Sequence, residues 1–202
     1  MVREGLVGRG IRDKRVLEVM AQMPRHVFVD EALWPEAYGE HALPIGHGQT
    51  MSQPYIVARM CELLKLSGPE RVLEVGLGSG YNAAVLSKLT RSVFAIERIP
   101  ELAERARRRL ESLGIKNVIV RIGDGRAGWK SFAPFDRIVV SAAAPEIPSR
   151  LSEQLADLGR MVLPVGVQEE QCVVLLERRG DKVLRKEVER VRFVPLVGGR
   201  NA

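Results

Sequence analysis

The stretch VLEVGLGSGYN at residues 72–82 decides how this chain folds, because an apolar run leads into a glycine-rich turn and then into a helical pattern. Gly76, Gly78 and Gly80 let the backbone approach a ligand closely, and a helix that begins after them offers unpaired N–H groups. Tyr81 stands where the dinucleotide fingerprint G-x-G-x-x-G requires a small residue. The stretch predicts a strand, a ligand-binding turn and a helix, with little space for a pyrophosphate.

On the C-terminal side of this stretch, apolar runs alternate with helical patterns. The strand-like runs lie at residues 71–76, 92–97, 117–122, 135–141, 161–166, 171–180 and 182–193, and the helical patterns at residues 79–89, 100–114 and 148–156. Alternation of this kind indicates a parallel sheet covered on both faces, and the last strands indicate an antiparallel end. We predict an α/β fold with a doubly wound, mostly parallel Rossmann-like sheet and an antiparallel C-terminal end.

On the N-terminal side the organisation differs. DKRVLEVMAQM at residues 13–23 has helical spacing and ends at Pro24, and a second helical pattern covers residues 55–65. Residues 24–54 between them are rich in Pro, Gly, His and aromatic side chains. A structureless connection of this length is uncommon in a compact domain, so we expect a functional cover.

Within that cover, IGHGQTMSQPY at residues 45–55 is predicted to be a shaped loop. Gly46, Gly48 and Pro54 disfavour the interior of a helix or a strand. The loop supplies hydroxyls, amides and backbone N–H groups, but it contains no carboxylate and no thiol. It therefore suits a reaction that needs alignment more than a strong base or nucleophile.

The charge of the chain does not point to nucleic acid. The formal net charge is +6, from 31 Lys and Arg and 25 Asp and Glu, and the pI is about 9.7. Much of this excess lies at residues 101–114, where Glu and Arg four residues apart are typical of a solvated helix face. Aromatic residues make up 5% of the chain, which disfavours a stacking platform for bases. We expect no nucleic-acid partner.

The cysteines and the apolar runs indicate in which cellular compartment the protein functions. Cys61 and Cys172 lie far apart in apolar runs and form no CxxC pair, which fits a reducing environment. No apolar run approaches the ~18 residues of a membrane span, and the N-terminus has no apolar signal-peptide core. We expect a cytoplasmic protein that does not bind membranes.

Two acidic residues follow neighbouring strands of the predicted sheet. Glu97 ends the second strand, where a carboxylate can accept hydrogen bonds from ribose hydroxyls. Asp124 lies in Gly-Asp-Gly at the end of the third strand, where it can meet an adenine amino group. Each also has an ordinary structural explanation, Glu97 as a helix-start acid and Asp124 as a turn former. Three ligand-suited ends on consecutive parallel strands favour a binding edge.

This arrangement resembles the class I S-adenosylmethionine-dependent methyltransferases. The resemblance implies a class I methyltransferase fold and a set of cofactor-binding residues, namely Gly76, Gly78, Gly80, Glu97, Asp124 and Gly125. It implies S-adenosyl-L-methionine as cofactor, S-adenosyl-L-homocysteine as product, and no metal. It also implies a single domain of residues 1–202, in which residues 69–202 form the cofactor-binding core and residues 1–68 form a substrate-covering extension.

The resemblance narrows when further segments are included. PRHVFV (24–29), ALPIGHGQTMSQPYIVA (42–58), GDG (123–125), SAAAPEIP (141–148) and RFVPL (192–196) occur in the order and spacing of the protein-L-isoaspartate O-methyltransferase family. The family implies methylation of the α-carboxylate of L-isoaspartyl residues in damaged proteins and peptides, followed by repair to aspartate through a succinimide. It assigns catalysis to Ser52. We also expect Thr50 and Gln53 to be cofactor-binding residues, although both residues also suit capping of the next helix.

The chemistry agrees with the composition of the loop. A carboxylate with an ordinary pKa near 4 is already ionised at neutral pH, so the acceptor needs no general base. Catalysis then reduces mainly to holding the acceptor oxygen about 3–3.5 Å from the methyl carbon and in line with the sulfur. One residue departs from the family pattern, because Leu77 stands where a small hydroxyl residue is common.

Two alternatives remain open from the sequence. A class I methyltransferase that acts on a different carboxylate in a dedicated peptide shares the same scaffold, and fold does not decide substrate. A non-catalytic nucleic-acid-binding protein is a distant alternative, supported only by the pI. We expect an enzyme, a protein carboxyl O-methyltransferase, that functions as a monomer.

Overall fold

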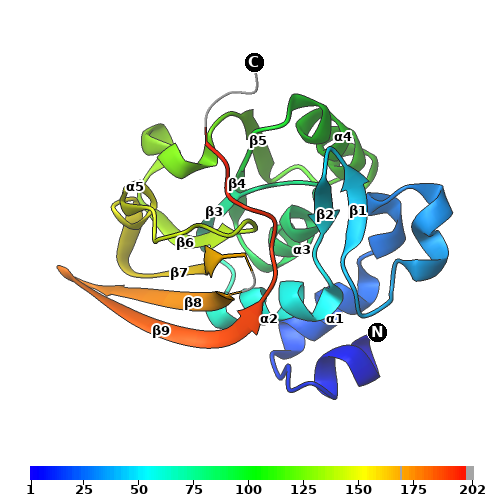
Figure 1. Cartoon of the computed structure of the whole chain (residues 1–202), viewed down its shortest axis with the longest axis horizontal. Helices are drawn as coiled ribbons and strands as arrows, with labels where there is room; N and C mark the ends of the chain where they lie inside the picture. The colour runs from blue at the N-terminus through cyan, green and yellow to red at the C-terminus, as the bar shows by residue number, and fades with distance from the viewer. Residues whose placement is uncertain (169, 199–202) are drawn as a thin grey trace.

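The computed structural model describes residues 1–168 and 170–198, and its centre is a seven-stranded sheet (Figure 1). The strands are β3 (Arg71–Val75), β4 (Ser92–Glu97), β5 (Val118–Ile122), β6 (Phe135–Val140), β7 (Leu155–Val167), β8 (Glu170–Arg179) and β9 (Lys182–Val191). Their spatial order is β5-β4-β3-β6-β7-β8-β9. The pairs from β5 to β7 are parallel, whereas β8 and β9 pair antiparallel. The predicted fold class is confirmed.

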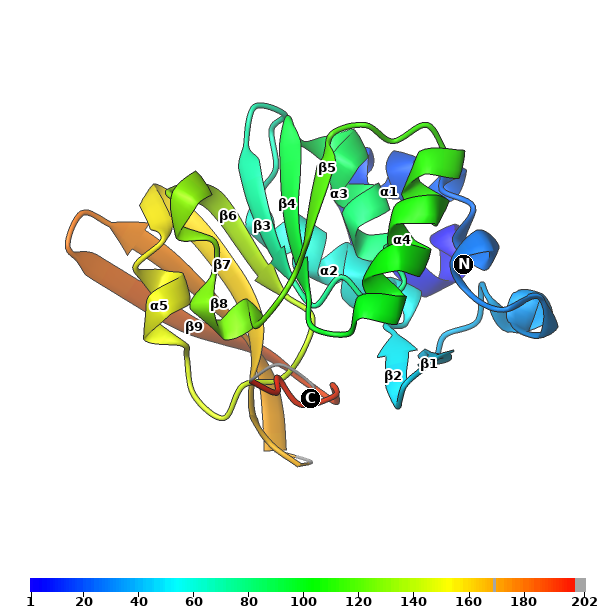
Figure 2. The same ribbon diagram turned by 90° about the horizontal axis from the view of Figure 1, so that it is seen from above.

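Helices cover both faces of the sheet, unevenly. They are α1 (Lys14–Gln22), α2 (Pro54–Leu64), α3 (Tyr81–Leu89), α4 (Pro100–Ser112) and the short α5 (Ser149–Ser152). Figure 2 shows α1 to α4 on one side and α5 on the other. The crossovers through α3 and α4 step outward from β3, and the crossover through α5 steps the opposite way, so a constant right-handed sense places them on opposite faces. No helix in the described ranges is long and apolar enough to cross a membrane.

Two apolar clusters hold these layers together. The cluster on the face of α1 to α4 joins Leu6 and Phe28 of the N-terminal segment to Val72 and Val93 of the sheet. The opposite face packs Phe94, Phe135 and Leu151, with Trp129 against them. The runs predicted as strands are apolar without alternation because β3, β4 and β6 are buried on both faces.

The segment before β3 is more regular than predicted. It contains the short helices η1 (Val2–Val7), η2 (Arg25–Phe28) and η3 (Glu31–Glu36), and a hairpin of β1 (Leu43–Gly46) and β2 (Gln49–Met51). The prediction that residues 45–55 form a shaped loop outside strands and helices was wrong in this respect. Gly46 and Gly48 are compatible with the hairpin because both have positive φ, 91° and 67°, at the bulge and the turn.

The connection between β6 and β7 also differs from the prediction. The helix expected at residues 148–156 is α5, which has four residues, and β7 already begins at Leu155. β7 extends well before the apolar run at 161–166, through a polar stretch in which Leu158 has a φ of 58° and is 73% exposed. Because this part of the strand is irregular and half solvated, its sequence shows no alternation of apolar and polar residues.

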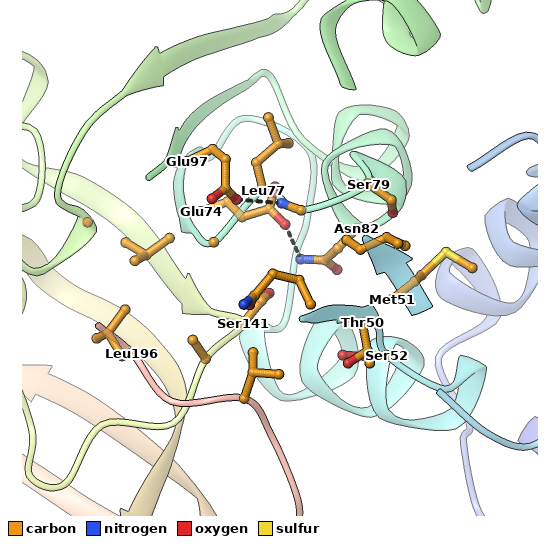
Figure 3. A pocket seen from close by; sticks show the side chains of 18 of the residues that line it. Thr50, Met51, Ser52, Glu74, Leu77, Ser79, Asn82, Glu97, Ser141 and Leu196 are labelled. Atoms are coloured by element: carbon orange, nitrogen blue, oxygen red, sulfur yellow. Dashed lines mark hydrogen bonds between the residues drawn. The ribbon is translucent and has the colours of Figure 1, made fainter. Parts of the chain in front are cut away.

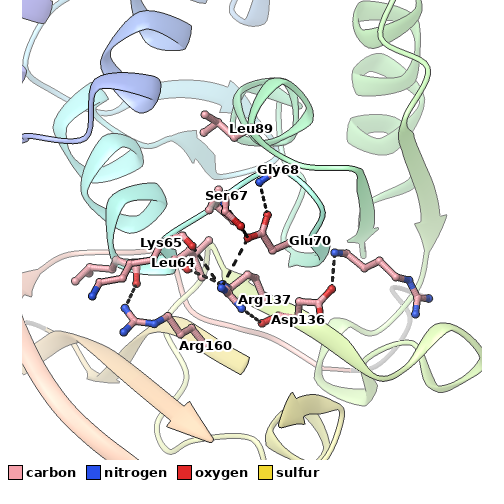
Figure 4. A network of polar contacts seen from close by, with 12 residues as sticks. Leu64, Lys65, Ser67, Gly68, Glu70, Leu89, Asp136, Arg137 and Arg160 are labelled. Atoms are coloured by element: carbon pink, nitrogen blue, oxygen red, sulfur yellow. Dashed lines mark hydrogen bonds and ion pairs between the residues drawn. The ribbon is translucent and has the colours of Figure 1, made fainter. Parts of the chain in front are cut away.

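A polar network fixes the amino ends of β3 and β6 (Figure 4). The buried carboxylate of Glu70 accepts hydrogen bonds from the backbone N–H groups of Ser67 and Gly68, both at 2.8 Å. Arg137 lies 3.8 Å from the same carboxylate and donates from Nε to the carbonyl of Leu64 at 2.6 Å. Burial by itself raises the pKa of Glu70, but the hydrogen bond from the Ser67 hydroxyl, together with those from the backbone N–H groups, outweighs burial and lowers the pKa. The network ties the end of α2 to the sheet.

Candidate active site

A cleft opens at the carboxyl ends of β3 and β4, beside the end of β6, where the strand order reverses (Figure 3). It contains about 1020 Å³ of empty space, including its open mouth. Its lining comes from distant parts of the chain, with residues 49–52, 74–79, 96–99, 141–142 and 194–197 among others. A switch point of this kind is where open α/β sheets bind ligands.

The glycine turn forms the floor of the cleft on the β3 side. Gly76, Gly78 and Gly80 all have positive φ, at 87°, 53° and 91°, and Gly76 donates its N–H to the carbonyl of Ile96 at 2.9 Å. Gly76 and Gly78 line the cleft, but Gly80 is outside the lining. A Cβ at Gly80 would lie 3.2 Å from Cβ of Ala106, so this glycine allows the turn to pack against α4.

Glu97 organises the turn through its carboxylate. Oε2 accepts the N–H of Gly78 at 2.8 Å, and Oε1 accepts the N–H groups of Arg98 and Ile99 at 2.8 and 2.9 Å. The side chain lines the cleft and is buried. Since each carboxylate oxygen has two lone pairs, Oε2 retains acceptor capacity for a ligand hydroxyl.

Glu74 is the most unusual group in the cleft. It is 0% exposed, its Oε1 accepts a hydrogen bond from Nδ2 of Asn82 at 2.8 Å, and its buried Oε2 has no partner among the described residues. Burial raises the pKa of Glu74 to about 8; the hydrogen bond from Asn82 works against this shift and the nearby charge of Glu97 adds to it. The cleft therefore holds a buried acid with one oxygen unpaired within the described chain, and a cationic ligand would favour its ionised form.

The other predicted residues are divided by the structure. Thr50, Ser52 and Gly125 line the cleft, whereas Asp124 and Gln53 are outside the lining. Asp124 begins the short helix η4 (Gly125–Ala127) and accepts the N–H of Arg126 at 2.9 Å, as a turn former does. Gln53 is the N-cap residue of α2, but its side chain makes no capping hydrogen bond.

The match to a family model decides the identity. The model for "Protein-L-isoaspartate(D-aspartate) O-methyltransferase" matches residues 2–201 of this chain. The chain belongs to this protein-L-isoaspartate O-methyltransferase family. The predicted family is thereby confirmed, and with it the predicted activity, S-adenosylmethionine-dependent carboxyl methylation in isoaspartyl repair. The family match favours this activity over both alternatives.

Relatives in this methyltransferase family support the assignment in sequence and in structure. A protein-L-isoaspartate O-methyltransferase 1 from Syntrophobacter fumaroxidans is 54% identical over 98% of this chain and 92% of its own length. A solved structure named protein-L-isoaspartate O-methyltransferase superposes with a TM-score of 0.88 at 30% identity, over 98% of this chain and 66% of that longer one. A Plasmodium falciparum structure described as a "putative protein-L-isoaspartate O-methyltransferase beta-aspartate methyltransferase (PCMT)", in complex with S-adenosyl-L-homocysteine, gives a TM-score of 0.83 at 25% identity, over 98% of this chain and 97% of that one.

The residues of the cleft fit the cofactor of this methyltransferase family. S-adenosyl-L-methionine is a cation with an amino acid end and a ribose, and the cleft offers the unpaired Oε2 of Glu74 and the acceptor capacity of Glu97. Leu77, which departs from the family pattern, is 3% exposed and packs in the cluster on the face of α1 to α4. Among the described residues, no group of three or more His, Cys, Asp or Glu could hold a metal ion.

Sequence reasoning missed several residues of this methyltransferase cleft. Asn82 and Ser141 line it and were given no role, although both stand in segments that carry the family resemblance and the acid of Glu74 inside a buried strand was a signal. The chain end at residues 194–197 reaches the cleft because Ala143 donates to the carbonyl of Val194 at 2.8 Å and accepts the N–H of Leu196 at 2.7 Å. The segment RFVPL at residues 192–196 was matched to the family from the sequence, but its pairing with Ala143 has no local signature.

Proposed function

We propose that Ser52 orients the acceptor carboxylate during methyl transfer to L-isoaspartyl residues. The observation that carries this proposal is the position of Ser52 and Thr50 in the lining, on the β2 side of the cleft and facing the glycine turn (Figure 3). Their hydroxyls are neutral donors, so they can hold an anion without the tight ion pairing of an arginine. Ser52 is the residue that the family pattern connects with catalysis.

The composition of the lining supports a reaction without a general base. The cleft residues of the described chain include no histidine, cysteine or lysine, and the acids Glu74 and Glu97 lie on the β3 and β4 side. An ionised carboxylate is itself the nucleophile, so the residues of the loop need only align it and exclude water. The bound cofactor supplies a methyl group activated by a positively charged sulfur.

The cofactor roles are proposed in two groups. Gly76, Gly78 and Gly125 would contact the cofactor through their backbone, and the carboxylate of Glu97 would accept its ribose hydroxyls. To these we add Glu74 for the cationic amino acid end of the cofactor. The remaining predicted residues, Gly80, Asp124 and Gln53, would act indirectly by shaping the turn, η4 and the start of α2.

We further propose that residues 1–202 act as one domain, in which residues 1–68 cover the substrate and residues 69–202 hold the cofactor. The shared apolar cluster between the two parts supports this view. A monomer is supported by the edge strand β9, whose many charged side chains discourage pairing with another sheet. Both cysteines are free, which fits the reducing environment of the cytoplasm.

The test is methyl transfer from labelled S-adenosyl-L-methionine to two peptides that differ only in isoaspartate or aspartate. Wild type should give base-labile label on the isoaspartyl peptide, and Ser52→Ala should lower kcat roughly 10- to 100-fold because the acceptor is less well aligned. Ser112→Ala, at the exposed end of α4, is the matched control and should behave as wild type. A Ser52→Ala enzyme with normal kcat and KM would exclude the proposed role.

A further inference from the structure

Arg25, which lies beneath the loop that carries Ser52, is the largest fully buried side chain of the described residues. It begins η2, is 0% exposed, and makes no ion pair within the described chain. Its Nε donates to the carbonyl of Ala37 at 2.7 Å, and its Nη2 donates to the carbonyl of Ser52 at 2.7 Å. One guanidinium therefore joins η2, the end of η3 and the loop.

Burial of this cation is costly in the absence of a carboxylate partner. Removing a guanidinium from water is unfavourable, and an apolar side chain of similar volume would fill the same space without that cost. The burial lowers the pKa of Arg25, and its Nη1 finds no hydrogen-bond partner among the described residues. The planar fork nevertheless serves two carbonyls in fixed directions, one from Nε and one from Nη2. This geometry points to a requirement for accurate placement of the loop.

The guanidinium also contacts the cofactor side of the cleft. Its Cζ lies 4.7 Å from the ring centroid of Tyr81, and Tyr81 packs edge-on against Phe28 at 5.4 Å. Tyr81 is the first residue of α3, directly after the glycine turn, and it lines the cleft. Arg25 thus spans the space between the loop and the helix that follows the turn.

We propose that Arg25 is a positioning residue, which fixes the backbone of Ser52 against the first turn of α3 and so sets the direction of the Ser52 hydroxyl. This inference rests on the proposed role of Ser52. It assigns to Arg25 no contact with substrate or cofactor, since Arg25 is outside the lining of the cleft. Lysine would keep the charge, but its three N–H groups share one nitrogen, so it would not reach both carbonyls as Nε and Nη2 of Arg25 do.

The experiment is a double-mutant cycle on the isoaspartyl peptide with wild type, Ser52→Ala, Arg25→Lys and the double variant. A misplacement of about 1 Å costs roughly 100-fold, so Arg25→Lys should lower kcat by about 10- to 100-fold. Equilibrium binding of S-adenosyl-L-methionine should stay close to that of wild type, because the cofactor residues are untouched. In the Ser52→Ala background the same substitution should have little further effect, since its target is gone.

Arg137→Lys is the matched control. Arg137 is also a largely buried arginine that donates to backbone carbonyls, but it lies in the network at the amino ends of the strands, away from the cleft (Figure 4). The Arg137→Lys enzyme should have a lower thermal stability than wild type, without a change in kcat or KM. Assays in the cold with saturating cofactor keep destabilised variants folded, and Arg25→Gln provides a second substitution if Arg25→Lys does not fold.

The outcomes separate the two proposals. A normal Ser52→Ala enzyme overturns the role of Ser52 and the inference about Arg25 together. An impaired Ser52→Ala enzyme with fully multiplicative effects in the double variant keeps Ser52 and overturns the action of Arg25 through it. Weakened cofactor binding in Arg25→Lys, with kcat preserved, would also overturn the inference.

Discussion

Glu74→Gln removes the charge of a buried carboxyl while keeping its shape. The glutamine oxygen can still accept the hydrogen bond from Nδ2 of Asn82, which the glutamate accepts at 2.8 Å. In the wild type, burial raises the pKa of Glu74 to about 8, far above the usual value of 4.5. Between these two pKa values the folded protein still holds the proton, whereas the unfolded chain has already released it.

The sign and size of the effect follow from that difference. The contribution of Glu74 to stability is complete below its unfolded pKa, and it is lost progressively as the pH rises towards the folded pKa of about 8. Between about pH 6 and about pH 8 this loss is about 2 kcal/mol in the free energy of unfolding. Glutamine does not titrate, so the advantage of Glu74→Gln over wild type should grow by that amount across the same interval.

The cofactor should reverse the preference. A bound cation favours the ionised carboxylate, so S-adenosyl-L-methionine should displace a proton from wild type and bind more tightly as the pH rises, by at most about tenfold per pH unit. Glu74→Gln should bind more weakly and without this pH dependence. Calorimetry in buffers of different ionisation enthalpy counts the released proton directly.

Urea unfolding at several pH values, with and without cofactor, tests both statements. The control is the same series on Ser112→Ala, which has no titratable group added or removed. If wild type and Glu74→Gln showed parallel stability profiles over this range, Glu74 would not be a protonated buried acid. If proton release accompanied cofactor binding equally in both proteins, another group would be its source.

Three further predictions concern single groups. Glu97→Gln replaces a carboxylate that accepts three backbone N–H groups with an amide that has a single acceptor oxygen. The Kd for the cofactor, measured by calorimetry, should therefore rise roughly tenfold or more. An unchanged Kd would remove Glu97 from the site. Gly78→Ala adds a Cβ that lies 3.2 Å from Cδ1 of Ile45, at a residue whose φ is 53°. Thermal unfolding should show that the free energy of unfolding falls by about 1–2 kcal/mol, and the cofactor should bind more weakly. Wild-type stability and affinity would contradict the strain argument. Glu70→Gln should lower the free energy of unfolding in urea by about 1–3 kcal/mol at neutral pH and by much less in acid. The reason is that the pKa of Glu70 is lowered in the fold, so the carboxylate stabilises the fold only while it is ionised. The kcat should not change.

The parallel half of the sheet was predictable because its strands are buried on both faces. Continuous apolar runs such as residues 92–97 leave little choice of structure, and the glycine turn after β3 marks a strand end that lines the cleft. The start of β7 was not predictable, since the exposed Leu158 and its polar neighbours have neither strand nor helix periodicity. The β1–β2 hairpin was hidden by Gly46 and Gly48, whose positive φ is a feature of the hairpin itself.

The site was predictable to the level of strand ends, but not of side-chain directions. Glu97 and Gly125 follow strand ends and line the cleft, whereas Asp124, one residue before Gly125, turns to Arg126 instead. Sequence position does not distinguish these two outcomes, because a rotation of one residue changes which group faces the ligand. The pairing of Glu74 with Asn82 depends on how the helix leaves the turn, and that angle is set by tertiary packing.

The C-terminal segment that pairs with Ala143 has a consequence for biosynthesis. The glycine turn, Glu97 and the Ser52 loop are all made before residues 194–197, which complete the cleft. Domains begin to fold from the N-terminus during synthesis, so a nascent chain can assemble its central strands long before its pocket is closed. Cofactor binding should therefore occur late in the synthesis of each molecule, and partial translation products should have a sheet without a complete binding site.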